Sequence, residues 1–162
     1  KILIELGAKE KNITGVDLRQ DRLDAAKKIY PKANFLKMDA GNLKFSSRKF
    51  DFINIFTLFS SVNDLESRFK ISNEIQRVLK PNGFILYYDL RYNNPANKDV
   101  VGIHRDELWL LFSRMKKNIN TLTILPPLVR MLGSYTQTLY KIFSKAPVLR
   151  THYIGLFGNN KN

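Results

Sequence analysis

Residues 12–23, with the sequence NITGVDLRQDRL, constrain the fold more than any other stretch of the chain. An apolar strand-like run ends at Asp17, and a helical pattern follows at once. In open α/β sheets, ligands lie beyond the carboxyl ends of the strands, where an acid can accept hydrogen bonds from both ribose hydroxyls of an adenosine-containing cofactor. The alternative is that Asp17 caps a helix over residues 20–29 by accepting from its first amides.

Two further expected strands carry an acid at the same end. The run ANFLKMDA over residues 33–40 reaches Asp39, and the run FILYYDL over residues 84–90 reaches Asp89. Because parallel strands end at one edge of a sheet, we expect that edge to face a ligand rich in hydroxyl and amino donors. The alternative for Asp39 is an Asx turn into Gly41.

Periodicity and turn residues predict alternating strands and helices. The run FDFINIFTLFSSV over residues 50–62 has so few polar residues that we expect a central parallel strand, buried on both faces. A helix over 64–80, with its apolar stripe at Leu65, Phe69, Ser72, Ile75 and Leu79, is stopped by the segment KPNG. Other strands are expected at 12–18, 33–40, 84–90, 118–125 and 151–157, and other helices at 1–8, 19–30, 105–112 and 128–143.

The start of the chain does not match the start of such an alternation. Residues 1–8, KILIELGA, read as the end of an amphipathic helix that stops at Gly7. A helix in this place should follow a first strand and a glycine-rich turn whose amides approach the cofactor. We therefore expect this chain to lack the first strand and the glycine-rich motif of its fold.

Length and composition limit the function classes. The 162 residues suit a single domain, and the absence of cysteine excludes disulfides, thiolate metal sites and cysteine nucleophiles. The two histidines, His104 and His152, are far apart, so we expect no metal site. Neither a membrane-spanning run nor a signal-peptide pattern is found, which favours a cytoplasmic location.

The formal net charge of +13 raises the question of an anionic partner. The basic residues form no long run and do not alternate with aromatic residues, which disfavours nucleic acid. The excess is denser toward the C-terminus, where Arg130, Lys141 and Lys145 accompany the apolar segment 128–143. That segment is either a helix packed on the sheet or an interfacial helix resting on anionic lipid, so peripheral membrane contact remains open.

The order GVDLRQDRL, MDA, FDFINIFTLFSSV and RVLKPNGFILYYD resembles the successive motifs of class I S-adenosylmethionine-dependent methyltransferases. The resemblance covers residues 12–89, and RVLKPNG is its most specific part. The later runs DLRYNNPANKDVVGIHRDELWLLF, TLTILPPLVRML and LRTHYIGLF resemble a bacterial subgroup associated with polysaccharide biosynthesis. The family implies a three-layer α/β/α domain over 1–162 with a mostly parallel twisted sheet and an antiparallel last strand. Residues 104–162 would then form its acceptor side.

The resemblance also implies roles for residues that bind S-adenosylmethionine. Asp17 would take the ribose hydroxyls, and Leu18 would pack on the adenine. Asp39 would accept the adenine amino hydrogen, with the backbone amide of Ala40 near a ring nitrogen.

The resemblance implies that Phe56 and Thr57, near the end of the expected strand 50–62, border the methionine part of the cofactor. The family's glycine-rich loop, which also meets the methionine part, has no counterpart here. The residues present therefore describe half of a cofactor pocket.

A sulfonium methyl group is already activated, so the enzyme's task is to hold an acceptor in line with it. An amine acceptor must be neutral, whereas a hydroxyl needs a base. We expect Asp89 or His104 as that base, with Tyr92 and Asn93 positioning the acceptor. The alternatives are that RYNNP is only a turn and that His104 only caps the helix over 105–112.

These observations predict a methyltransferase that acts on a small-molecule or saccharide-linked acceptor. One alternative is a nicotinamide-dependent oxidoreductase, because an acid after a second strand is shared with that class. Another is a non-catalytic, degenerate Rossmann-like module, which the absent glycine-rich loop permits.

Overall fold

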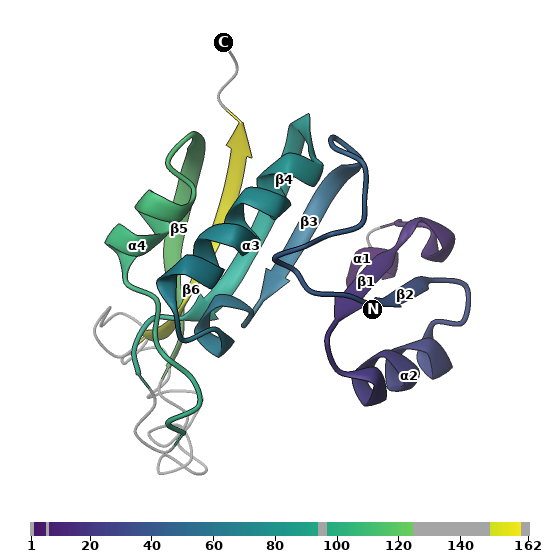
Figure 1. The fold of residues 1–162 in the computed structure, drawn as a ribbon, viewed down its shortest axis with the longest axis horizontal. Helices are drawn as coiled ribbons and strands as arrows, with labels where there is room; N and C mark the ends of the chain where they lie inside the picture. The colour runs from purple at the N-terminus through teal and green to yellow at the C-terminus, as the bar shows by residue number, and fades with distance from the viewer. Residues whose placement is uncertain (1, 6, 94–96, 125–149, 160–162) are drawn as a thin grey trace. The chain divides into compact units, whose positions relative to one another are not determined.

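The computed structural model of the protein describes residues 2–5, 7–93, 97–124 and 150–159 (Figure 1). The chain divides into two compact units, residues 1–45 and 46–162, which are described separately below. The expected helix over 128–143 lies outside the described residues. That the whole chain forms one methyltransferase domain stays a prediction.

The first unit is a parallel strand pair joined by a helix. Its strands are held in register from Thr14 opposite Asn34 to Asp17 opposite Lys37. The connecting helix buries Leu23, and Gly7 ends the first helix with a φ of +96°, a left-handed conformation that favours glycine. The elements are α1 (Ile2–Glu5), the 3-10 helix η1 (Glu10–Asn12), β1 (Thr14–Asp17), α2 (Gln20–Ile29) and β2 (Asn34–Lys37).

The second unit is a mixed sheet with the strand order β3-β4-β6-β5. Strands β3 and β4 are parallel, and β6 is antiparallel to both β4 and β5. This arrangement confirms the predicted α/β class with an antiparallel last strand. The elements are β3 (Phe50–Phe56), the 3-10 helix η2 (Phe59–Ser61), α3 (Leu65–Val78), β4 (Leu79–Leu90), α4 (Arg105–Leu111), β5 (Met115–Ile124) and β6 (Arg150–Asn159).

The core of this unit lies between the sheet and the helices α3 and α4, which cover the same face in Figure 1. Strand residues of one parity are buried there and surround a group of aromatic rings. The ring of Phe157 stacks on Tyr87 at 5.4 Å and meets Phe112 at 5.1 Å, and Phe59 meets Phe112 edge-on at 5.7 Å. Rings in such geometries stabilise a core beyond the area that they bury.

The expectation that residues 50–62 form a central strand buried on both faces is wrong. In the described part of the chain, β3 pairs with β4 alone and stands at the edge of its sheet. Phe52 is 39% exposed and Phe56 is 56% exposed. An apolar run shows that a strand can be buried, but the elements that lie against it decide whether it is.

The start of α3 and its buried face can both be compared with the prediction. The helix begins at Leu65, and Asp64 caps it, because its Oδ1 accepts a hydrogen bond of 2.7 Å from the amide of Ser67. The predicted apolar stripe is rotated from the observed one, since Leu65 is 47% exposed. The buried residues of α3 are Arg68, Ile71, Ser72, Ile75 and Val78.

Helix α3 ends at Val78, before the KPNG segment, and that segment is not a separate turn before a strand. Strand β4 already begins at Leu79, which lies opposite Phe50, while the next paired residue, Phe84, lies opposite Phe52. Residues 80–83 are therefore an irregularity within the ladder. No helix in the described residues is long and apolar enough to cross a bilayer.

Candidate active site

The two acids of the first unit lie at one edge of its strand pair. Strands β1 and β2 run parallel, and the amide of Met38 donates to the backbone carbonyl of Asp17 at 3.1 Å. Asp39 follows directly and is exposed. The structure therefore brings together the carboxyl ends that carry Asp17 and Asp39, as the parallel arrangement predicts.

Local contacts of these carboxylates show which of the alternative structural roles each one takes. Asp17 Oδ1 accepts from the amide of Arg19 at 2.9 Å, a residue that precedes α2, and Oδ2 lies 3.6 Å from the guanidinium of Arg22. Asp17 therefore makes an Asx turn and does not cap the amides within the helix. Asp39 Oδ1 accepts from the amide of Gly41 at 2.8 Å, the Asx turn proposed as its alternative role.

The residues beside these acids differ in exposure. Leu18 is 63% exposed, which leaves an apolar side chain next to Asp17 open to a flat ligand. Ala40 is half-buried. Their predicted contacts with adenine stay predictions.

Thr57, directly after β3, has an unusual backbone conformation. Its φ is +47°, a region that β-branched residues rarely adopt. Its amide donates to the carbonyl of Tyr88 at 2.8 Å, and its own carbonyl accepts from Ser61 Oγ at 3.0 Å. The neighbouring Phe56 ring lies 5.7 Å from that of Tyr88. Such strain persists only where the surroundings hold it, and it clusters at ligand sites.

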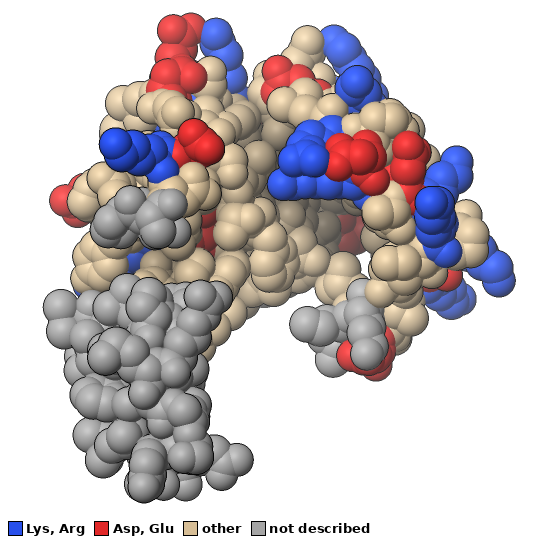
Figure 2. All heavy atoms as spheres, turned by 90° about the horizontal axis from the view of Figure 1, so that it is seen from below, with Lys and Arg blue, Asp and Glu red and all other residues tan. Residues whose placement is uncertain are grey.

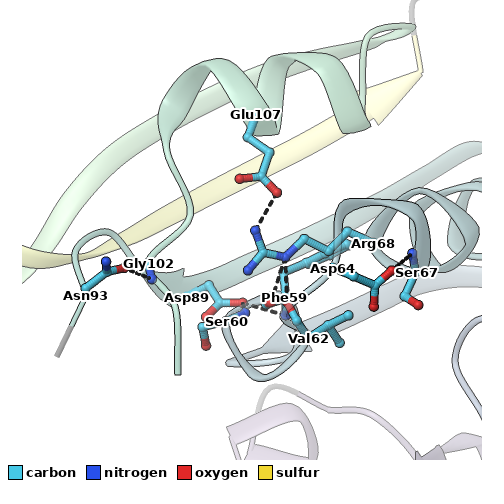
Figure 3. A network of polar contacts seen from close by, with 10 residues as sticks. All are labelled: Phe59, Ser60, Val62, Asp64, Ser67, Arg68, Asp89, Asn93, Gly102 and Glu107. Carbon is cyan, nitrogen blue, oxygen red and sulfur yellow. Dashed lines mark hydrogen bonds and ion pairs between the residues drawn. The ribbon is translucent and has the colours of Figure 1, made fainter. Parts of the chain in front are cut away.

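Asp89 is fully buried and holds the turn that follows Thr57 (Figure 3). Its Oδ2 accepts from the amides of Phe59 at 2.9 Å and Ser60 at 3.2 Å, and its Oδ1 accepts from the amide of Leu90 at 2.8 Å. Burial raises the pKa of the Asp89 carboxyl, and the backbone amides oppose this effect. The observed contacts of Asp89 are thus structural, and its role as a base stays a prediction.

Arg68 of α3 makes the main buried polar contacts that were not predicted from the sequence. The side chain is 5% exposed, and its Nε donates to the carbonyls of Phe59 at 3.2 Å and Val62 at 2.7 Å. Its Nη1 donates to Oε1 of Glu107 at 2.7 Å. The spacing of Arg68 three and four residues before Ile71 and Ser72 was the available signal, since it puts the three on one helix face.

The predicted acceptor residues lie on two segments that the structure brings side by side. Asn93 Oδ1 accepts from the amide of Gly102 at 2.8 Å, so this side chain fastens residues 91–93 to residues 101–103. A Cβ on Gly102 would lie 2.4 Å from the carbonyl carbon of Tyr92, which explains the glycine. The Tyr92 side chain is 39% exposed and lies beneath the guanidinium of Arg91 at 4.7 Å.

The two histidines have different surroundings. His104 is exposed at the N-cap position of α4, but its side chain makes no capping hydrogen bond. His152 stacks on Tyr88 with ring centroids 4.7 Å apart, and its Nδ1 lies 2.9 Å from Thr151 Oγ1. Burial lowers the pKa of His152. In the described ranges, no group of three or more His, Asp or Glu side chains could hold a metal ion.

The surface charge is mixed on the face drawn in Figure 2. Lys and Arg side chains there are interspersed with Asp and Glu and do not gather in one large patch. Among the described residues, Arg19 pairs with Asp21 at 2.6 Å and Lys80 pairs with Asp51 at 2.8 Å.

The sequence and the fold were compared with known proteins. A family model described as "Methyltransferase domain" matches residues 1–87. The chain is 36% identical over 84 residues to a phthiotriol/phenolphthiotriol dimycocerosates methyltransferase of Mycobacterium tuberculosis. That match covers 50% of this chain and 30% of the relative, so the chain spans less than a third of the length of the curated relatives it matches.

Solved structures show the same fold at low sequence identity. A SAM-dependent methyltransferase from Methanosarcina mazei has a TM-score of 0.64 at 17% identity, with 99% of this chain and 88% of the other covered. The N-methyltransferase NodS from Bradyrhizobium japonicum, solved in complex with S-adenosyl-L-homocysteine, has a TM-score of 0.66 at 10% identity, with 91% and 66% covered. These likenesses establish the Rossmann-like arrangement of the chain.

Proposed function

This chain belongs to the methyltransferase domain family, and from that premise we propose that it binds S-adenosylmethionine and directs its methyl group to a small-molecule or saccharide-linked acceptor. The observation that carries the proposal is the parallel pairing of β1 and β2, which brings Asp17 and Asp39 to one edge. Carboxylates there suit a ligand with ribose hydroxyls and an exocyclic amine.

In this proposal, residues at the ends of β1 and β2 recognise the adenosine. Asp17 accepts from the ribose hydroxyls, and the exposed Leu18 packs on the adenine ring. Asp39 accepts from the adenine amino group, while the amide of Ala40 donates to a ring nitrogen. Both carboxylates already accept from a backbone amide, which fixes their orientation before a ligand arrives.

Phe56 and Thr57 stay the predicted neighbours of the methionine part of the cofactor. When bound, the cofactor supplies a methyl group on a positively charged sulfur, which is a good leaving group. The protein then has to hold the acceptor in line and exclude water, and such alignment accounts for about 7–11 kcal/mol of barrier lowering. The strained but well-fixed turn at Thr57 suits that task.

For a hydroxyl acceptor we propose His104 as the base, with Asp89 as the alternative. His104 is exposed, and imidazole is well suited to accept a proton near neutral pH. Asp89 is fully buried against backbone amides, so it could act only if the turn of η2 moved. Tyr92 would then contact the acceptor, while Asn93 would position it by holding residues 101–103 in place.

The acceptor can be sought in two classes of compound. The curated relatives are named for phthiotriol and phenolphthiotriol dimycocerosates, so lipid extracts belong in the screen beside saccharide fractions. A role in polysaccharide biosynthesis, a cytoplasmic location and contact of the basic C-terminal part with anionic lipid stay predictions.

Two ligand titrations and one labelling experiment test the proposal. The purified protein should bind S-adenosylhomocysteine saturably in calorimetry and should not bind NADH. With methyl-labelled S-adenosylmethionine, label should enter one component of a saccharide or lipid extract, as judged by mass spectrometry. Binding of NADH alone would favour the oxidoreductase, and binding of neither ligand would favour the degenerate module.

A further inference from the structure

The buried Arg68–Glu107 pair joins two parts of the second unit to which the proposed function gives different tasks. We propose that Arg68 is a positioning residue that couples the turn after Thr57, on the cofactor side, to residues 101–107, on the acceptor side. The inference rests on the proposed function, because that function assigns one of these segments to the cofactor and the other to the acceptor of the same reaction.

On the cofactor side, buried charges of both signs hold the turn. The amides of Phe59 and Ser60 donate to Asp89, and the carbonyls of Phe59 and Val62 accept from Arg68. A carboxylate thus faces amide hydrogens and a guanidinium faces carbonyl oxygens, the favourable arrangement in both cases. The position of the turn therefore depends on where the Arg68 guanidinium is held.

On the acceptor side, Glu107 fixes α4 to the same guanidinium at 2.7 Å (Figure 3). Two backbone bonds reinforce this attachment just before the helix. The amide of Val101 donates to the carbonyl of Ser60 at 2.9 Å, and the amide of Ile103 donates to the carbonyl of Leu90 at 2.9 Å. Residues 101–107, which include His104, are thus attached directly to the turn of η2.

The chemistry of the pair favours a positioning role over simple stabilisation. A buried ion pair often contributes little net stability, because both ions lose their hydration. The Nη2 atom of Arg68 is buried without a hydrogen-bond partner in the described residues, which adds to that cost. The planar fork, however, lets Nε reach two carbonyls of the turn while Nη1 reaches Glu107, and a lysine has a single nitrogen for both tasks.

Hydrogen exchange with and without S-adenosylhomocysteine tests the coupling. In the wild type, the ligand should slow exchange of the Val101 and Ile103 amides about fivefold or more, although it binds on the other side of the pair. In Glu107→Gln and in Arg68→Lys this slowing should fall to about twofold or less, while the ligand Kd stays within about threefold. Glu74→Gln breaks an Arg–Glu pair of 2.7 Å within α3 and is the matched control, which should keep the full effect.

The outcomes separate this inference from the proposed function. A purely structural role would change exchange equally with and without the ligand, so full slowing in both Glu107→Gln and Arg68→Lys overturns the coupling. The same holds if the wild type binds the ligand and shows no slowing. If the wild type does not bind the ligand, the proposed function fails and the coupling fails with it. Should Glu107→Gln not fold, Arg68→Lys, which keeps the charge, decides the matter.

Discussion

Removing the Asp89 carboxylate should destabilise the second unit strongly. In Asp89→Ala, the amides of Phe59 and Ser60 lose their acceptor in a buried place, and the amide of Leu90 loses its acceptor in a part-buried one. Each buried donor left without a partner costs about 1–3 kcal/mol, and water entering the vacated space would reduce the total. We therefore expect the free energy of unfolding to fall by about 3–5 kcal/mol.

Asp89→Asn separates hydrogen bonding from charge. The amide oxygen can still accept from η2, but its NH2 group faces the Leu90 amide, so about 1–3 kcal/mol should be lost. Burial raises the folded-state pKa of the Asp89 carboxyl above 3.8. Between pH 3.8 and that raised pKa, the folded wild type therefore binds more protons than the unfolded chain. Its free energy of unfolding should therefore fall as pH rises through this window. The deficit of Asp89→Asn should accordingly be larger near pH 4 than near pH 7.

Urea denaturation followed by tryptophan fluorescence measures these changes. Trp109 is the only tryptophan of the chain and lies in α4, so its signal reports on the unit that contains Asp89. If Asp89→Ala lost less than about 1 kcal/mol, the three amides would not depend on this carboxylate and the reasoning would be refuted.

Three further substitutions test other parts of the structure. Gly102→Ala puts a Cβ 2.4 Å from backbone of Tyr92 and should cost about 1–3 kcal/mol in urea denaturation; an unchanged midpoint would contradict the packing. His152→Phe keeps a ring stacked on Tyr88. Because burial lowers the pKa of His152 below 6.5, the free energy of unfolding of the wild type should fall as pH falls through that lowered pKa. In the variant, the free energy of unfolding should change less between pH 7 and pH 4. Parallel slopes would rule out His152 as the cause. Thr57→Gly relieves a positive φ and should raise the free energy of unfolding by about 1 kcal/mol while weakening S-adenosylhomocysteine binding; a gain in both would argue against contact with the ligand.

Predictions from the sequence were correct where backbone geometry fixes the position of a residue in the fold. The change from strand to helix at Asp17 and the acid at Asp39 follow such a rule, because parallel strands must end at one edge. The antiparallel last strand followed from the family resemblance, and the structure confirms it.

The remaining features depend on which surfaces meet. The sequence predicts that Arg68 lies on the surface, but the observed orientation of α3 buries it against Glu107 of α4. The apolar run of β3 predicts burial, but its exposed Phe52 and Phe56 show that neighbouring elements decide the outcome. The spacing of Arg68, Ile71 and Ser72 carries a local signal for the rotation of α3, whereas the cover of a strand is not encoded in a local pattern.

The central claim is that Asp17 binds the ribose of S-adenosylmethionine, and calorimetry with S-adenosylhomocysteine on the wild type and Asp17→Ala tests it most directly. A carboxylate hydrogen bond is worth about 1.5–3 kcal/mol, so the variant should bind about tenfold to a hundredfold more weakly. Asp21→Ala removes a nearby exposed acid that pairs with Arg19 and should leave the affinity unchanged. Equal affinities of the wild type and Asp17→Ala, with both proteins folded by circular dichroism, would contradict the account.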